Sequence, residues 1–205
     1  MINKKLKQKF KEYRQSFKIK ELTKKDNKIF FDNEVVEDEN GILNTDCEKF
    51  INIKYSSKCS INRVLSNLFP YKFKFRGKKV NSIESVLQGI KYKDKKTQKC
   101  VFNYFGLDAY HTRASNIFDF WGNNGKLYFW GKEIDRQSEN YQNFLDELYL
   151  SCLKNPLYKR AIKSTGNKYL LHHIGRTDPH ETVLTRFEYE CRLCALQKLI
   201  MEEKV

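Results

Sequence analysis

The sequence predicts a mainly helical α+β fold, a compact helical domain with a few short β-strands and an N-terminal extension. Apolar residues recur at helical spacing over much of the chain after residue 80. Two segments, 51–55 and 71–75, alternate as strands do. Three Pro and nine Gly in 205 residues argue against long linkers, and 15 Phe with 12 Tyr are typical of a folded globular protein. We therefore expect an extension over residues 1–50 and one domain over 51–205.

The extension changes its charge along its length. Residues 1–25 are basic and carry spaced apolar residues, which predicts an amphipathic helix: Leu6, Phe10, Phe17, Ile19 and Leu22. Such a helix either docks on the domain or serves as an arm that faces nucleic acid or a membrane. Residues 26–50 turn acidic and contain the strand candidate "KIFF", so we interpret them as a connector or an edge hairpin.

The domain opens with strands and a capped helix. "INIKY" and "YKFKF" are the strand candidates, and "RG" at 76–77 supplies a turn into "KKV". Asn81 is the expected N-cap of a helix that runs to about Tyr92, with Glu84 at the third position of a capping box. An apolar stripe of Ile83, Leu87 and Ile90 should face the core. After a Lys-rich break, another apolar run extends from Cys100 to Phe105.

The middle of the chain predicts a hairpin and two helices. The segment 117–131 has aromatic residues on both sides of Asn123, Asn124 and Gly125, which favours a hairpin that turns there. A long helical pattern over 135–163 is interrupted at Asn155 and Pro156. Gly166 then suits the end of the second helix.

Two further helix starts lie in the last third. Asp178, Pro179 and Glu181 fit the N-cap, first and third positions of a short helix. Thr185 with Glu188 forms a second capping box for a final helix that we expect to end near residue 203.

The charge of the chain favours an anionic partner. Lys and Arg total 39 against 25 Asp and Glu, a formal charge of +14, which suits nucleic acid, a nucleotide or a phosphorylated sugar. A solubilising lysine coat explains the same composition equally well. The six cysteines have no disulfide-scaffold spacing and no signal peptide precedes them, so we expect reduced thiols and a cytoplasmic protein, of a host cell if the chain is viral. No apolar run is long enough to span a bilayer.

Several function classes lack their motifs. GxGxxG and GxxxxGK[ST] are absent, so a nucleotide, if bound, would be held by side chains and helix ends, and no cofactor is expected. The four histidines lack metal spacing, and Cys191 with Cys194 forms a CxxC inside an apolar helical run, where packing is the better interpretation than zinc. We therefore expect no metal. No GxSxG element indicates acyl transfer.

A polar row on the helix after residue 81 is the main candidate for chemistry. Glu84, Gln88 and Lys91 repeat the spacing of the apolar stripe one residue later, about 100° around the helix, which places them at the margin of the core. Carboxylates, a lysine and aromatic rings suit glycosidic chemistry, in which a carboxylate stabilises an oxocarbenium-like centre or activates water. A lysine amine could instead attack a ring-opened anomeric carbon.

The segment that holds this row resembles a known family. "LSNLFPYKFKFRGKKVNSIESVLQGIKY" is similar to the pattern of YbiA-like (NADAR) proteins, with matching residues at Ser66, Asn67, Pro70, Phe73, Gly77, Glu84, Gln88 and Lys91. "STGNKYLLHHIG" resembles a later turn and strand of the family, so the resemblance covers about 58–200. Ser85 stands where the family commonly has histidine, and the late region departs from its pattern.

The resemblance implies an enzyme that hydrolyses N-glycosidic bonds. The expected activity is removal of ADP-ribose from guanine bases of nucleic acid or nucleotides. It further implies that Glu84 is a substrate-binding or acid–base carboxylate, that Lys91 is the amine that forms a transient Schiff base, and that Trp121 stacks on a base or ribose. Ser66, Asn67 and Gln88 would bind substrate, as would Asp178 near a late acidic position.

Each residue also has a structural interpretation. Glu84 would then be a capping residue, Lys91 a solvated lysine, Trp121 a core residue and Asp178 an N-cap. Two further functions stay open. One is an N-glycosidase for a phosphorylated ribosylamino-pyrimidine of the riboflavin pathway, and the other is a non-catalytic module that binds ADP-ribose or nucleic acid.

Overall fold

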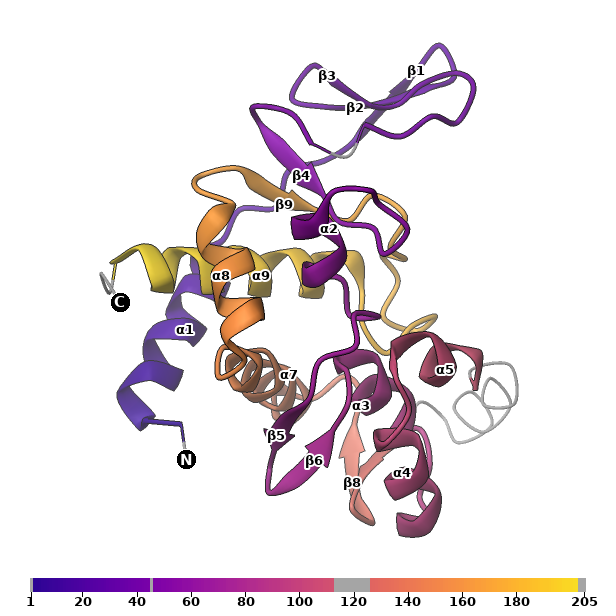
Figure 1. The fold of residues 1–205 in the computed structure, drawn as a ribbon, viewed down its shortest axis with the longest axis vertical. Helices are drawn as coiled ribbons and strands as arrows, with labels where there is room; N and C mark the ends of the chain where they lie inside the picture. Colours follow the sequence, from indigo (N-terminus) through magenta and orange to yellow (C-terminus); the bar gives the residue numbers. More distant parts are fainter. Residues whose placement is uncertain (1, 45, 113–125, 203–205) are drawn as a thin grey trace.

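The computed structural model describes residues 2–44, 46–112 and 126–202, and it has the predicted α+β fold (Figure 1). Its helices are α1 (Lys4–Ser16), α2 (Ser60–Leu65), α3 (Ile83–Gly89), α4 (Lys95–Phe102), α5 (Gly106–His111), α7 (Glu139–Cys152), α8 (Pro156–Ser164) and α9 (Arg186–Glu202). Its strands are β1 (Thr23–Lys25), β2 (Lys28–Phe31), β3 (Glu34–Glu37), β4 (Phe50–Asn52), β5 (Phe73–Phe75), β6 (Lys78–Val80), β7 (Lys126–Phe129), β8 (Lys132–Asp135) and β9 (Tyr169–Leu171).

Helix α9 lies at the centre of the molecule and is buried along most of its length. It packs against α1, α7 and α8, which surround it in Figure 1. Leu193 and Leu196 of α9 are fully buried, as are Phe144 and Leu148 of α7. Each such side chain stabilises the fold by about 1.5–3 kcal/mol. Cys191 and Cys194 of the CxxC segment are free thiols buried in this core, as packing predicts.

The N-terminal segment contributes to the same core. Helix α1 contacts α9 and α7, and its Phe10 is fully buried. The predicted amphipathic helix thus exists, and within the residues described it ends at Ser16 rather than continuing to residue 25. Strands β1, β2 and β3 form a small antiparallel sheet at one end of the molecule (Figure 1), and "KIFF" is its central strand. Strand β4 pairs in parallel with β9, far along the chain.

Among the described residues, four hairpins turn through two residues with positive φ, the geometry of type I′ turns. These residues are Asp26–Asn27, Asp32–Asn33, Arg76–Gly77 and Trp130–Gly131. The predicted "RG" turn is therefore confirmed. The predicted turn at 123–125 lies outside the described residues. Strand β7 pairs with β8, and the Trp130 amide in the turn between them donates to the Gln98 side chain at 2.7 Å.

The start of helix α3 differs by one residue from the prediction. Ser82, not Asn81, is the N-cap, and Ser82 and Ser85 form the capping box. Glu84 is therefore the second helical residue, and its side chain does not cap the helix. The predicted stripe of Ile83, Leu87 and Ile90 is buried as expected.

Later helix boundaries follow the sequence signals in two of three places. Asn155 caps α8 with Pro156 at its first position, which confirms the break between α7 and α8. Thr185 and Glu188 form the predicted capping box of α9. The short helix predicted at 178–181 is wrong. The Asp178 side chain accepts from the His180 amide at 2.8 Å, which produces a single turn that is not continued.

Gly106 at the start of α5 is pressed against the segment that precedes β5. A Cβ atom on this residue would lie 2.0 Å from the carbonyl oxygen of Leu68. We expect Gly106→Ala to destabilise the protein by about 3 kcal/mol, because backbone rather than a flexible side chain must move. The free energy of unfolding in urea measures this loss. Helix propensity alone would predict that Gly106→Ala raises this free energy.

Gly77→Ala is the matched control for this substitution. Gly77 has a positive φ of 79°, with nothing near its would-be Cβ. Gly77→Ala should lower the free energy of unfolding by only about 1 kcal/mol, the cost of an alanine in the left-handed region. Equal effects of the two substitutions would contradict the close approach at Gly106.

Candidate functional site

Four of the residues singled out from the sequence come together where the loop after α2 meets the start of α3. The Glu84 amide donates to the Asn67 backbone carbonyl at 3.0 Å, which joins the loop to the helix. Ser66 is buried, and its hydroxyl oxygen accepts from the Leu68 amide. Gln88 lies one turn after Glu84 on the same helix. The loop and the first two residues of the polar row, Glu84 and Gln88, therefore form one site.

The sequence predicted that Glu84 lies at the margin of the core, but its carboxylate is buried. It is 9% exposed, and Gln88 is 5% exposed, because α4 and α5 both pack on α3. The Gln88 side-chain amide donates to Glu84 Oε1 at 2.6 Å. This bond and the positive end of the helix dipole both stabilise negative charge on the carboxylate.

Gln88 has an unfilled hydrogen-bond acceptor. Its Oε1 atom is buried, yet it has no hydrogen-bond partner among the described residues. A buried, unpaired amide oxygen costs about 1–3 kcal/mol, so such an atom calls for an explanation. The unfilled acceptor stands next to a buried carboxylate, which is an arrangement suited to a polar ligand group.

Two tyrosines hold the loop in place beneath this pair. Tyr149 of α7 donates to the Asn67 side chain at 2.9 Å, and Tyr189 of α9 donates to the Leu65 carbonyl at 2.6 Å. Burial raises the pKa of both Tyr149 and Tyr189 well above the usual value. Both hydroxyls therefore stay protonated and donate. The sequence analysis missed them, since two tyrosines so far from the loop in sequence give no local signal.

The remaining predicted site residues are Lys91, Trp121 and Asp178. Lys91 follows α3 and is half-buried, so it is not simply a solvated lysine. Trp121 lies outside the described residues. Asp178 is exposed, and its carboxylate shapes the turn to His180.

His172 is a further residue beside the site that the sequence analysis did not select. Its ring packs edge-on against the Tyr189 ring, with centroids 5.2 Å apart, and its Nδ1 lies 2.9 Å from the Ile53 carbonyl. Burial lowers the pKa of His172 to about 4, against the opposing effect of the Ile53 hydrogen bond. The ring is therefore neutral near pH 7.

This burial makes the stability of the fold depend on pH. An unfolded histidine binds its proton near pH 6.5, whereas native His172 does so only near pH 4. The unfolded state therefore binds more protons in this interval, and its stabilisation at low pH lowers the free energy of unfolding. His172→Asn keeps a donor toward Ile53 but removes the imidazole. We expect its free energy of unfolding to fall by about 2 kcal/mol less than that of the wild type between pH 7 and pH 4.5.

Urea unfolding at the two pH values measures this difference. The exposed His180→Asn is the matched control and should keep the wild-type slope. Parallel profiles for His172→Asn and the wild type would show that His172 does not carry the effect.

The elements around α3 are strongly basic. Residues 72–99 contain ten lysines and arginines against Glu84 and Asp94. Six of them lie on β5, β6 and α4; α4 and β6 contact α3, and β5 pairs with β6 (Figure 1). Such a surface attracts anions to the region of Glu84.

Metal binding and membrane insertion find no support in the part of the chain that the structure describes. Within 2–44, 46–112 and 126–202, no three His, Cys, Asp or Glu side chains are placed to share a metal ion. Over the same ranges, the helices are too short or too polar to cross a bilayer.

Comparison with known proteins identifies the family. The family model of bacteriophage protein GP30.3 matches residues 60–198, more than half of the chain. The chain belongs to the bacteriophage GP30.3 family. A curated relative is the uncharacterized 17.1 kDa protein in the Gp30–rIII intergenic region of Enterobacteria phage T4. It is 26% identical over 127 residues, which cover 61% of this chain and 82% of the relative. No solved structure matches the chain.

This assignment corrects the resemblance inferred from the sequence. The matched model is that of the GP30.3 family, not of YbiA-like or NADAR proteins, so the earlier family assignment is wrong. The residues that suggested it, from Ser66 to Lys91, lie within the GP30.3 match. Their pattern alone therefore did not identify the family. The case for chemistry at Glu84 therefore depends on the geometry described above.

Proposed function

We propose that this member of the GP30.3 family is a hydrolase of N-glycosidic bonds that removes ADP-ribose from guanine bases in nucleotides or nucleic acid. The observation that carries the proposal is the buried Glu84–Gln88 pair, with its unfilled acceptor on Gln88. A ribose hydroxyl is the kind of group that would donate to this acceptor.

The chemistry assigned to Glu84 requires few other groups. The bond between C1′ of the ribose and the guanine nitrogen breaks, and its electron pair leaves with the base, which takes up a proton. A buried carboxylate stabilises the positive charge that develops on the ribose, or it takes a proton from the water that adds to C1′. The products are free ADP-ribose and the unmodified guanine base, still attached to its own nucleoside, nucleotide or nucleic acid. Gln88 orients the carboxylate through the 2.6 Å hydrogen bond.

Lys91, which follows α3 by two residues, supplies an alternative route. Its amine would displace the base nitrogen at C1′ of the ring-opened sugar to form an imine, which water then hydrolyses. Cyanoborohydride would trap this imine as a covalent adduct of the protein. An adduct in the wild type and in Lys93→Ala, but not in Lys91→Ala, would support this route, and no adduct would leave Glu84 alone as the acting residue.

The positive charge supports a substrate carried by nucleic acid. The basic residues on β5, β6 and α4 flank α3, where a phosphate backbone would lie beside the substrate base. We further propose that the protein acts in the cytoplasm of the infected cell, which the phage family and the free cysteines support.

The test is an incubation of the purified protein with three substrates, followed by mass spectrometry. They are ADP-ribosylated guanosine, DNA that carries the same adduct, and the ribosylamino-pyrimidine phosphate of the riboflavin pathway. Release of ADP-ribose supports the proposal. Turnover of the pyrimidine alone would favour the small-metabolite activity instead, and no release from any substrate would overturn both.

A non-catalytic binding module is the second candidate. The observation that favours it is the exposed position of Asp178, which leaves Glu84 as the one carboxylate among the predicted site residues that lies in the site. It predicts saturable binding of ADP-ribose to the intact protein without release of product over hours.

A further inference from the structure

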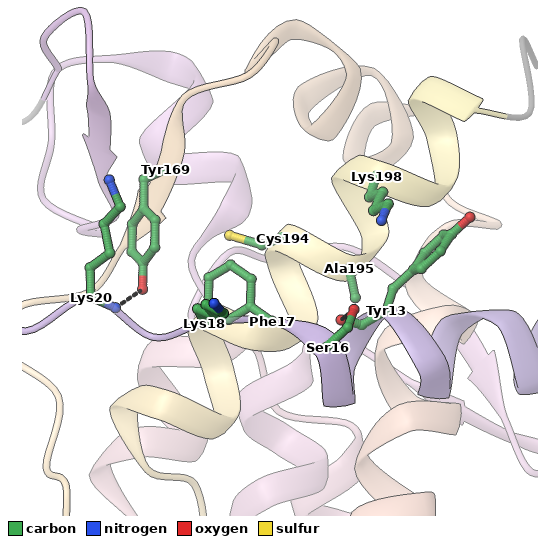
Figure 2. A pocket seen from close by; sticks show the side chains of 9 residues that line it. All are labelled: Tyr13, Ser16, Phe17, Lys18, Lys20, Tyr169, Cys194, Ala195 and Lys198. Atoms are coloured by element: carbon green, nitrogen blue, oxygen red, sulfur yellow. Dashed lines mark hydrogen bonds between the residues drawn. The ribbon is translucent and has the colours of Figure 1, made fainter.

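A pocket separate from the Glu84 site lies between α9 and the end of α1. A shallow pocket of about 260 Å³ is lined by residues of α1, the following segment, β9 and α9, shown in Figure 2: Tyr13, Ser16, Phe17, Lys18, Lys20, Tyr169, Cys194, Ala195 and Lys198. None of these residues belongs to the polar row of α3. The pocket therefore needs its own explanation.

Aromatic rings stand at both ends of the pocket and small side chains lie between them. Tyr13 lies on one side and Phe17 on the other, with Ser16 and Ala195 in the middle (Figure 2). Phe17 also packs on Tyr169, with ring centroids 5.5 Å apart. This arrangement leaves room for a flat group that contacts ring surfaces, and aromatic rings bind nucleobases in this way.

Lysines surround the same pocket. Lys198 lies 4.4 Å from the centre of the Tyr13 ring and points toward it, whereas Lys18 is exposed beside Phe17 (Figure 2). Lys20 and Lys198 each have a carboxylate neighbour, Asp32 at 3.2 Å and Glu202 at 3.9 Å. Pairs this exposed are weak, so the lysines stay able to attract an anion.

We infer that this pocket binds a nucleotide, with the base against the rings of Tyr13 and Phe17 and the phosphate at the lysines. A volume of about 260 Å³ is below the roughly 300 Å³ at which small-ligand sites begin. The pocket therefore suits a base rather than a whole dinucleotide, and the phosphate would stay at its rim. Either a free mononucleotide or one nucleotide of a single strand presents this chemistry.

The pocket is lined by residues from both outside and inside the family match. Tyr13, Phe17 and Lys18 precede residue 60, where the GP30.3 match begins, while Cys194 and Lys198 lie within it. The N-terminal segment thus completes a site on a helix of the family domain. Burial raises the pKa of the Cys194 thiol to about 12, so this residue contributes to the lining and not a reactive thiolate.

The test is a calorimetric titration of the full chain with AMP, with a single-stranded oligothymidylate and with ribose 5-phosphate. We expect saturable binding of AMP or of the oligonucleotide, and at least tenfold weaker binding of ribose 5-phosphate, which has no base. Ser16→Trp, which fills the pocket from an exposed position, and Lys18→Glu should each weaken the binding tenfold or more. Lys24→Glu is the matched control, because it makes the same charge change at an exposed lysine outside the lining.

The titrations distinguish a free nucleotide from a single strand as the ligand, and both from the absence of a nucleotide site. Binding of AMP indicates a free nucleotide, and binding of the oligonucleotide alone indicates a single strand. Failure of both probes at millimolar concentration would overturn the inference. An equal loss in Lys24→Glu and Lys18→Glu, or equal binding of ribose 5-phosphate, would do the same, since general charge attraction would then explain the data.

Discussion

Glu84→Gln should reduce the release of ADP-ribose from ADP-ribosylated guanosine by 100-fold or more. The amide cannot stabilise a positive ribose or accept a proton from water, and such a group typically contributes 10²–10⁴-fold. The fold should survive, because the new side chain has the same shape and its oxygen can still accept from Gln88. The measurement is the initial rate by mass spectrometry, together with the thermal unfolding temperature.

Glu147→Gln is the matched control for Glu84→Gln. Glu147 of α7 pairs with Lys7 at 2.5 Å and with Arg76 at 2.6 Å, away from the polar row. This variant should keep the wild-type rate to within about twofold, since part-exposed ion pairs contribute little. If both variants keep the wild-type rate, Glu84 is not the acting carboxylate.

Arg192→Leu should destabilise the protein by about 4 kcal/mol, although it places an apolar residue in an apolar helix. Arg192 is fully buried in α9 and forms an ion pair with Asp146 at 2.9 Å. It also donates to the Gln142 side chain at 2.8 Å and to the Glu188 carbonyl. Removal of the guanidinium takes the donor from these half-buried acceptors, and the buried Asp146 then keeps Arg14 as its one ion-pair partner among the described residues.

Urea unfolding measures this loss, with Lys198→Leu as the matched control on the same helix. Lys198 is more than half exposed, so its replacement should change the free energy of unfolding by less than about 0.5 kcal/mol. A loss in Arg192→Leu that is no larger than in the control would contradict the structural role of this buried arginine.

Local signals predicted much of the secondary structure. The stripe of Ile83, Leu87 and Ile90, the break at Asn155 and the capping box at Thr185 all depend on residues within one or two helical turns. The predicted N-cap of α3, Asn81, was wrong by one residue. Asn81 and Ser82 are both good N-caps, and the packing of the fold determines that Ser82 is used.

Long-range contacts explain the features that the sequence did not predict. The parallel pairing of Ile51 with Leu170 joins segments far apart in the chain, and no local pattern announces it. The turn at Trp130 was missed because a tryptophan rarely adopts positive φ, and a distant side chain, Gln98, fixes it.

The same distinction applies to the site. The spacing of Glu84 and Gln88 predicted that the two side chains lie in one row, and their hydrogen bond shows that they are in contact. Their burial was not predictable, since it results from α4 and α5, whose packing on α3 depends on the whole fold. Arg192 within "CRLC" was a signal that could have been used, because an arginine in an apolar helix requires buried partners.

The central claim is that the unfilled acceptor of Gln88 and the carboxylate of Glu84 face one ligand. Its most direct test follows the side-chain amide signals in ¹⁵N-labelled protein during a titration with ADP-ribose. We predict that the Gln88 amide signal shifts in a saturable way, while that of Gln98, buried and bonded to the Tyr128 carbonyl, stays in place. A Gln88 signal that does not move while ADP-ribose binds elsewhere would contradict the claim.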